Sequence, residues 1–178
     1  MKLSPLLLTL LLGLSLGCHQ SVTPPPAPTT AASTPPAAEL PEAEVLGALD
    51  GREWNVGSPA VRSLGPGAAP VLIRIADDDR PERIAYQRVR ALLALRWHAT
   101  PSVETFLLGF VAGDHDAPRL RAALESLSIA FGASDRDRVI AACQSLSSHP
   151  DASVREAASR AEMQARVGRA MHSEPSAP

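Results

Sequence analysis

Lysine is almost absent from this sequence of 178 residues: it occurs only at Lys2, and the other sixteen basic residues are arginine. If residues 1–17 are removed as the signal peptide described below, the mature chain has no lysine at all. Such a chain cannot form a lysine Schiff base or place a P-loop lysine against phosphate groups. This absence excludes aldolase-type and pyridoxal-phosphate-dependent enzymes and Walker-type NTPases.

Aromatic residues, cysteines and net charge are also scarce. Aromatic residues make up 3% of the chain, which leaves few rings to line a deep small-molecule pocket. Two cysteines cannot form a disulfide-dense scaffold. A formal net charge of −2 argues against a strongly basic nucleic-acid binder, so we expect no nucleic acid partner. The 45% of hydrophobic residues suffice for one compact domain with appendages.

The N-terminus has the pattern of a secretory signal peptide. Lys2 provides a positive charge, and residues 6–16 are nearly all leucine. This apolar run is too short for a transmembrane helix, which needs about 20 residues, but it suits the apolar core of a signal peptide. The run ends in Leu-Ser-Leu-Gly-Cys at residues 14–18, and Gly17 followed by Cys18 resembles the lipobox of bacterial lipoproteins.

The lipobox resemblance implies a lipid anchor at Cys18. In that family the leader is cleaved before the cysteine, which makes residues 1–17 the expected signal peptide, and the cysteine carries a diacylglycerol. We therefore expect a lipid-anchored protein of the bacterial cell envelope. His19 stands where a familiar inner-membrane retention signal has aspartate, which favours the outer membrane. The alternative is an ordinary signal peptide followed by an incidental cysteine.

A proline-rich segment follows the lipidation site. Seven of the seventeen prolines fall between residues 21 and 44, and proline removes backbone donors and fixes φ. We therefore predict that residues 18–44 form a disordered tether, rich in Pro, Ala and Thr, of polyproline II character. About 25 such residues reach roughly 75 Å from a membrane. Residues 171–178 are predicted to form a disordered tail.

Beyond the tether, apolar residues recur at helical spacing. Val103, Phe106, Leu107 and Phe110, for example, fall at i, i+3, i+4 and i+7. The sequence predicts helices at 66–77, 81–97, 101–112, 117–131, 135–147 and 151–167. A short strand at 71–76 is an alternative within the first of them. The prolines expected at helix starts are Pro81, Pro101, Pro118 and Pro150, and the expected N-caps are Asp79, Thr100, Asp116, Ser134 and Asp151.

These helices form pairs at a nearly fixed period. The first helices begin near residues 66, 101 and 135, a spacing of about 35 residues. Two helices per 30–40 residues indicate an α-solenoid, so the expected fold class is all-α, with about three antiparallel helix pairs. Residues 45–64 are expected to cap the N-terminal end, with Val45, Leu46 and Leu49 facing inward and Trp54 covering the open end.

Two segments resemble the HEAT-repeat family. Residues 64–72 (LGPGAAPVL) look like the start of a HEAT first helix. Residues 149–158 (HPDASVREAA) look like the turn and second helix, which in that family often reads Asp-Pro-Asp-x-x-Val-Arg-x-x-Ala. The short bacterial HEAT-like type, seen also in bilin lyase subunits, is the most similar. The resemblance implies an armadillo-like helical repeat domain, which we expect at 45–170.

Arginines on the second helix of each pair are the candidate partner-binding residues. Second helices line the concave face in HEAT-type solenoids, and the planar guanidinium suits bidentate recognition of carboxylates. This face is therefore expected to bind an acidic protein segment or an anionic polymer. The alternative is internal pairing with Glu82, Glu125 or Glu156. The four candidates are Arg88, Arg90, Arg121 and Arg155.

Other reactive side chains have structural explanations. The acidic run at 77–79 lacks the glycine and distal glutamate of a calcium loop, so we interpret it as a solvated turn with a cap. Consecutive side chains diverge in Asp114-His115-Asp116, and no second cluster has zinc-like spacing. No G-x-S-x-G nucleophile elbow occurs. We therefore expect no catalytic residue, no metal site and no cofactor.

Cys143 has no intramolecular partner if Cys18 carries lipid. Its neighbours Ala141, Ala142 and Leu146 favour a free, buried thiol that packs as a small hydrophobic group. The alternative is a reactive thiol, which requires an electropositive and partly exposed setting.

The function expected from these features is a lipid-anchored envelope protein that acts as a non-catalytic scaffold or adaptor for an envelope protein partner. Two alternatives remain open. One is an enzyme helper, similar to lyase-type HEAT proteins, that binds a small molecule. The other is an envelope spacer that binds peptidoglycan.

Overall fold

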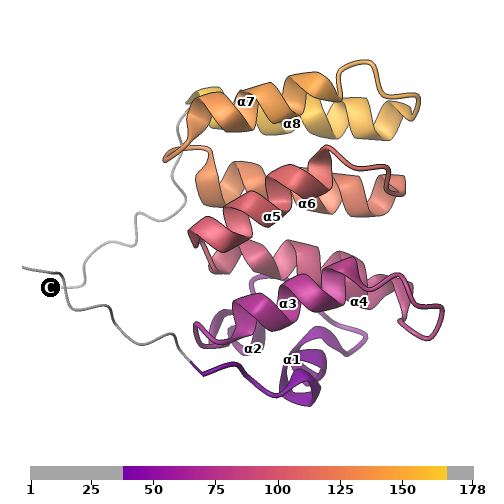
Figure 1. Ribbon diagram of the computed structural model, residues 1–178, viewed down its shortest axis with the longest axis vertical. Helices are drawn as coiled ribbons and strands as arrows, with labels where there is room; N and C mark the ends of the chain where they lie inside the picture. The colour runs from indigo at the N-terminus through magenta and orange to yellow at the C-terminus, as the bar shows by residue number, and fades with distance from the viewer. Residues whose placement is uncertain (1–37, 168–178) are drawn as a thin grey trace, which may run out of the picture. The chain divides into compact units, whose positions relative to one another are not determined.

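The computed structural model describes residues 38–167, which belong to one compact unit. All regular elements within these residues are helices, which confirms the all-α class (Figure 1). The expected signal peptide, Cys18, most of the tether and the C-terminal tail lie outside the described residues. The helices are α1 (Glu42–Leu49), α2 (Pro59–Arg62), α3 (Ala68–Asp77), α4 (Ala85–Ala94), the 3-10 turn η1 (Leu95–Trp97), α5 (Pro101–Val111), α6 (Ala117–Phe131), α7 (Arg136–Ser145) and α8 (Ala152–Val167).

Each of the six predicted helices corresponds to an observed one, from α3 to α8. The alternative of a strand at 71–76 is wrong, because these residues lie inside α3. The apolar residues of this segment are buried on one side of a helix, where Val71, Leu72 and Ile75 are fully covered. A short run of β-branched residues between prolines therefore folded according to its helical spacing rather than its strand propensity.

The start of the second helix was predicted wrongly. Helix α4 begins at Ala85 rather than at residue 81, so Pro81 lies in the preceding loop. Ion pairs hold that loop: the Asp78 carboxylate accepts hydrogen bonds from Arg80 at 2.7 Å and from Arg83 at 3.0 Å. These contacts pair the charged side chains of the loop without a helical turn, and α4 begins only after Arg83.

Two of the five predicted N-caps are confirmed at helices whose first turn contains a proline. The Thr100 hydroxyl accepts from the Val103 amide at 3.4 Å, and the Asp116 carboxylate accepts from the Arg119 amide at 3.0 Å. Asp151 precedes α8, and its carboxylate accepts from a backbone amide two residues on. Each cap supplies an acceptor to an amide that has no partner within the helix.

The other two predicted caps are wrong. Asp79 lies six residues before α4, and its carboxylate pairs with Arg119 instead. Ser134 is displaced by one position, since Asp135 directly precedes α7 and makes no side-chain cap bond. The Ser134 hydroxyl instead donates to the Phe131 carbonyl at 3.4 Å, which closes the end of the previous helix. Pro150 lies two residues before the first residue of α8.

Consecutive helices form three antiparallel pairs, α3 with α4, α5 with α6 and α7 with α8, and Figure 1 shows them one above another. The pairs join mainly through their second helices, since α6 packs extensively on both α4 and α8, whereas α3, α5 and α7 touch one another little. Small buried residues permit this close approach of the second helices. They are Ala122 and Ala123 on α6 and Ala157, Ala158 and Ala161 on α8.

Serine hydroxyls on α6 reinforce both of its interfaces. The Ser126 hydroxyl, which is fully buried, donates to the Leu92 carbonyl of α4 at 2.7 Å. On the other side, the Ser128 hydroxyl lies 3.1 Å from the Gln164 amide oxygen of α8. These bonds link residues 34 and 36 positions apart, close to the period of the helix pairs.

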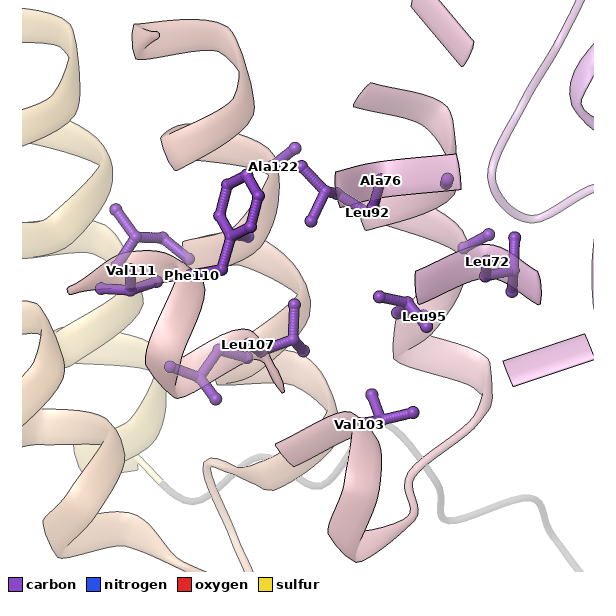
Figure 2. Packing of buried hydrophobic residues seen from close by; sticks show 14 of the residues in the cluster. Leu72, Ala76, Leu92, Leu95, Val103, Leu107, Phe110, Val111 and Ala122 are labelled. Atoms are coloured by element: carbon purple, nitrogen blue, oxygen red, sulfur yellow. The ribbon is translucent and has the colours of Figure 1, made fainter. Parts of the chain in front are cut away.

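One continuous apolar core runs through the stack and is made of leucine, valine and alanine with few rings. Figure 2 shows part of it, where Leu72, Leu92 and Leu107 from three different helices point inward. At the N-terminal end, α1 packs on α3 and α4. Val45 and Leu49 are buried as predicted, while Leu46 and Trp54 are partly buried against the core.

The last part of the predicted tether is ordered, which corrects the expectation for residues 38–44. Residues 42–44 belong to α1, and the Leu40 amide donates to the Gly67 carbonyl at 3.2 Å. Gly67 is required here, because a Cβ on it would collide with the backbone carbonyl of Ala38. An ion pair between Glu39 and Arg74 adds a further contact. The chain is therefore fastened to the start of α3 before α1 begins.

Candidate functional site

Arg88 and Arg90, both on α4, are used for contacts within the domain. Arg88 donates to the Asp79 carboxylate at 3.3 Å and to the Arg83 carbonyl at 3.0 Å. Arg90 donates to the carbonyls of Leu49 at 2.7 Å and Gly51 at 3.0 Å, at the end of α1 and just beyond it. Its guanidinium also lies over the rings of Trp54 and Tyr86, at 5.1 and 4.4 Å from their centroids. Arg90 thus joins the end of α1 to the first helix pair, whereas Arg88 holds the loop between α3 and α4.

Arg155 also has an internal role, at the start of α8. It donates to the carbonyls of His149 at 2.7 Å and Pro150 at 2.9 Å, which braces the turn between α7 and α8. Two of the three glutamates expected as internal partners of the candidates pair with other arginines. Glu125 pairs with Arg96 at 3.0 Å, and Glu156 lies 3.9 Å from Arg160.

Arg121 differs from the other three candidates. It is exposed on α6 and makes no ion pair or hydrogen bond with any residue from 38 to 167. Its side chain lines a groove of about 290 Å³ between α6 and α8. Arg160 lines the same groove from α8, so the structure brings together two arginines of which only one was predicted.

Sequence reasoning missed Arg160 because it matched equivalent repeat positions. Leu120-Arg121 and Val154-Arg155 align at a spacing of 34 residues, which suggested that Arg121 and Arg155 act together. Equivalent positions on stacked helices need not line the same groove, because each helix presents several faces to its neighbours. Arg160, more than one turn beyond Arg155, lines the groove with Arg121.

A second groove, of about 370 Å³, lies between α4 and the start of α6. Tyr86, Val89 and Pro118 contribute its apolar surface. At its edge, Arg119 bridges the carboxylates of Asp79 at 2.5 Å and Asp116 at 2.6 Å, and the hydrogen bond from Arg119 lowers the pKa of Asp79. The charges of this groove are therefore paired with one another.

The acidic clusters of the sequence are engaged by neighbouring side chains. Hydrogen bonds from Arg80 and Arg83 hold the pKa of Asp78 well below its usual range. His115 stacks on the Phe110 ring with a centroid separation of 3.7 Å, and Asp116 caps α6. In the described part of the chain, no three His, Cys, Asp or Glu side chains form a group that could hold a metal ion.

Cys143 is a free and buried thiol on α7, as predicted. Burial, together with the charge of Glu162, raises the pKa of the Cys143 thiol to about 11. At neutral pH the sulfur is therefore protonated, and the thiolate required for nucleophilic attack is scarce.

His98 is a buried titratable residue that was not among the predicted site residues. It follows η1 at the junction between the first and second pairs and is only 8% exposed. Its Nε2 atom has no hydrogen-bond partner among the described residues. Burial lowers the pKa of His98, because no neighbouring charge compensates the imidazolium. The one sequence signal for the burial of His98 is its position near Thr100 and Pro101, at the turn between the first and second helix pairs.

We expect His98 to make the domain less stable as the pH falls through the range just below 6.5. The folded pKa lies below the unfolded value, so the unfolded chain takes up the proton first and is favoured on acidification. Urea unfolding followed by circular dichroism between pH 7.5 and 5 would show a declining free energy of unfolding. The variant His98→Gln should lose this decline. An equal decline in the variant would assign it to another group.

Among residues 38–167, no helix combines the length and the apolar character that crossing a bilayer demands. No protein-family model, curated protein or solved structure matches the chain. The α6–α8 groove with Arg121 and Arg160 is therefore identified from its geometry alone.

Proposed function

We propose that this protein is a lipid-anchored component of the bacterial cell envelope whose helical domain is a short HEAT-like α-solenoid and serves as a non-catalytic protein-interaction scaffold. The observation that carries the proposal is the groove between α6 and α8, where Arg121 is exposed without an internal partner. An exposed arginine without an internal partner, beside a groove on stacked helices, suits a docking surface.

The contacts between helix pairs support the repeat architecture. The bond from Ser126 to the Leu92 carbonyl and the ion pair from Arg138 to Glu104 each join residues 34 positions apart. The first links two second helices, and the second links two first helices. A solenoid requires such repeated contacts between neighbouring units, since one helix pair cannot bury its apolar stripe alone.

The sequence features at the N-terminus support the proposed location. Cys18 follows a leucine-rich segment, and the chain between Cys18 and the first described residue, Ala38, is rich in proline. About 20 residues of polyproline II span roughly 60 Å. The helical domain would then work at a distance from the membrane, with its N-terminal end fastened to the tether through Leu40 and Gly67.

Site-specific photo-crosslinking in intact cells tests the scaffold proposal. Amine-reactive reagents are unsuitable, because lysine occurs only at position 2. A photo-reactive residue is placed at Gln164 in the α6–α8 groove, at Tyr86 beside the α4–α6 groove, or at Arg136 on α7 as a control. We expect one recurrent protein adduct from Gln164 or Tyr86 and none from Arg136. Absence of a recurrent adduct at both groove positions would refute the scaffold function.

A further inference from the structure

We infer that the groove between α6 and α8 recognises an extended, acidic segment of the partner protein through Arg121 and Arg160. This inference rests on the proposed scaffold function and gives the chemistry of the partner. It also restricts the binding residues, because three of the four arginines expected from the sequence have structural roles.

Both groove arginines are available to a ligand. Arg121 is exposed and has no polar partner within residues 38–167. Arg160 has only Glu156 nearby, at 3.9 Å, and both of these side chains are about 70% exposed. A surface pair of this kind contributes little, typically 0–1 kcal/mol, so a carboxylate from a partner can replace it at small cost.

Glu125 lies in the groove but does not neutralise it. Its carboxylate is 3.0 Å from the guanidinium of Arg96, whose side chain is only 7% exposed. Arg96 also donates to the Leu93 carbonyl at 2.9 Å, which fixes it beneath the surface. Because Arg96 compensates Glu125, the positive charge of Arg121 remains unbalanced, and Arg160 has only its weak, exposed pair with Glu156.

The shape of the groove suits a narrow chain. Ala157 and Ala161 line the groove from α8 and Ser128 lines it from α6, so three of its lining side chains are small. All three are nearly buried, which makes them the floor of the groove. A volume of about 290 Å³ accommodates one or two side chains rather than a folded element. Gln164, which also lines the groove, adds a side-chain amide for polar contacts with a backbone.

The charge pattern favours isolated carboxylates over a polyanion. Two arginines can each bind a carboxylate in bidentate geometry. Glu125 also lines the groove, and Glu156 lies 3.9 Å from Arg160, so a ligand with dense negative charge would meet repulsion at the same surface. The net charge of the chain, −2, adds no general attraction for such polymers. A peptide with separated glutamates or aspartates fits these conditions.

Binding of two labelled decapeptides to the full lipidated protein in detergent tests the inference. One peptide alternates glutamate with alanine, and the other has glutamine in place of each glutamate. Fluorescence anisotropy should show at least tenfold weaker binding of the glutamine peptide. The double variant Arg121→Ala, Arg160→Ala should lose at least tenfold for the glutamate peptide, and Arg136→Ala, which removes a charge from α7, should stay within twofold. Added salt should weaken binding of the glutamate peptide.

Several results would overturn the inference. Equal binding of both peptides, or unchanged binding by the double variant, would exclude recognition of carboxylates at these arginines. Binding to isolated sacculi that depends on Arg121 and Arg160, without binding of the glutamate peptide, would assign the groove to the wall polymer. Circular dichroism checks that the double variant is folded. Both arginines are exposed, so their replacement should leave the helix content unchanged.

Failure of the inference can be distinguished from failure of the scaffold function. If crosslinking at Tyr86 captures a recurrent partner while the glutamate peptide does not bind, the scaffold function stands and the partner uses the α4–α6 groove. If neither Tyr86 nor Gln164 captures a partner, the scaffold function itself is refuted.

Discussion

Replacing Leu92 with alanine should lower the free energy of unfolding by about 3 kcal/mol. Leu92 is fully buried on α4, which packs on both α3 and α6. In Figure 2 its side chain lies between Ala76 of α3 and Ala122 of α6. These two neighbours are too small to move into the vacated space, so the cavity stays open and the full cost of lost packing is expected.

Chemical denaturation and thermal unfolding of the purified protein measure this effect. A loss of about 3 kcal/mol corresponds to a melting temperature lower by roughly 10 °C for a domain of this size. Two matched variants serve as controls. Leu92→Met keeps the volume and should cost less than about 1.5 kcal/mol. Met163→Ala removes an exposed side chain on α8 and should change stability by about 0.5 kcal/mol or less. A Leu92→Ala variant as stable as these controls would contradict the close packing of the first two pairs.

The position of Leu92 illustrates why the helices could be predicted from the sequence. Apolar residues at helical spacing determine which face of each helix is buried, and Pro101 and Pro118 with their preceding caps mark two of the starts. These signals are local, so they can be recognised without knowledge of the neighbours. The all-α class and six of the helices were therefore predictable.

The errors arose where contacts distant in sequence determine local structure. Asp79 has the chemistry of an N-cap, yet its carboxylate is occupied by Arg119, 40 residues away. Residues 42–44 have the composition of a tether, but they form the first turn of α1, and Glu42 pairs with Arg83 at 2.5 Å. Single-residue preferences are weak compared with such tertiary contacts.

For the same reason, only one of the two groove arginines, Arg121, could be predicted from the sequence, and Arg160 could not. Arg121 could be identified from its place on a second helix. Whether it has an internal ion-pair partner depends on where the acidic side chains lie in the folded domain. Glu125, one turn along the same helix, is the expected partner for Arg121 by spacing. It pairs instead with Arg96, a buried arginine from the preceding helix pair. Arg121 is therefore left exposed without an internal partner, which is the observation behind its proposed role in binding.

Replacing Cys18 with serine should release the protein from membranes. The proposed anchor is a lipidated cysteine, and two or three acyl chains bind a bilayer firmly, whereas a protein without them has no such anchor. We therefore expect the variant to move from the membrane fraction to the soluble fraction of the envelope.

Membrane flotation and mass spectrometry of the N-terminal peptide measure this shift, and the second cysteine of the chain supplies a matched control. Cys143 is buried and protonated at neutral pH, so Cys143→Ala should leave membrane attachment unchanged while removing one sulfur. A Cys18→Ser protein that still floats with membranes would refute the lipid anchor. A released protein that still gives the crosslinked adduct at Gln164 would show that partner binding resides in the helical domain and does not require the membrane.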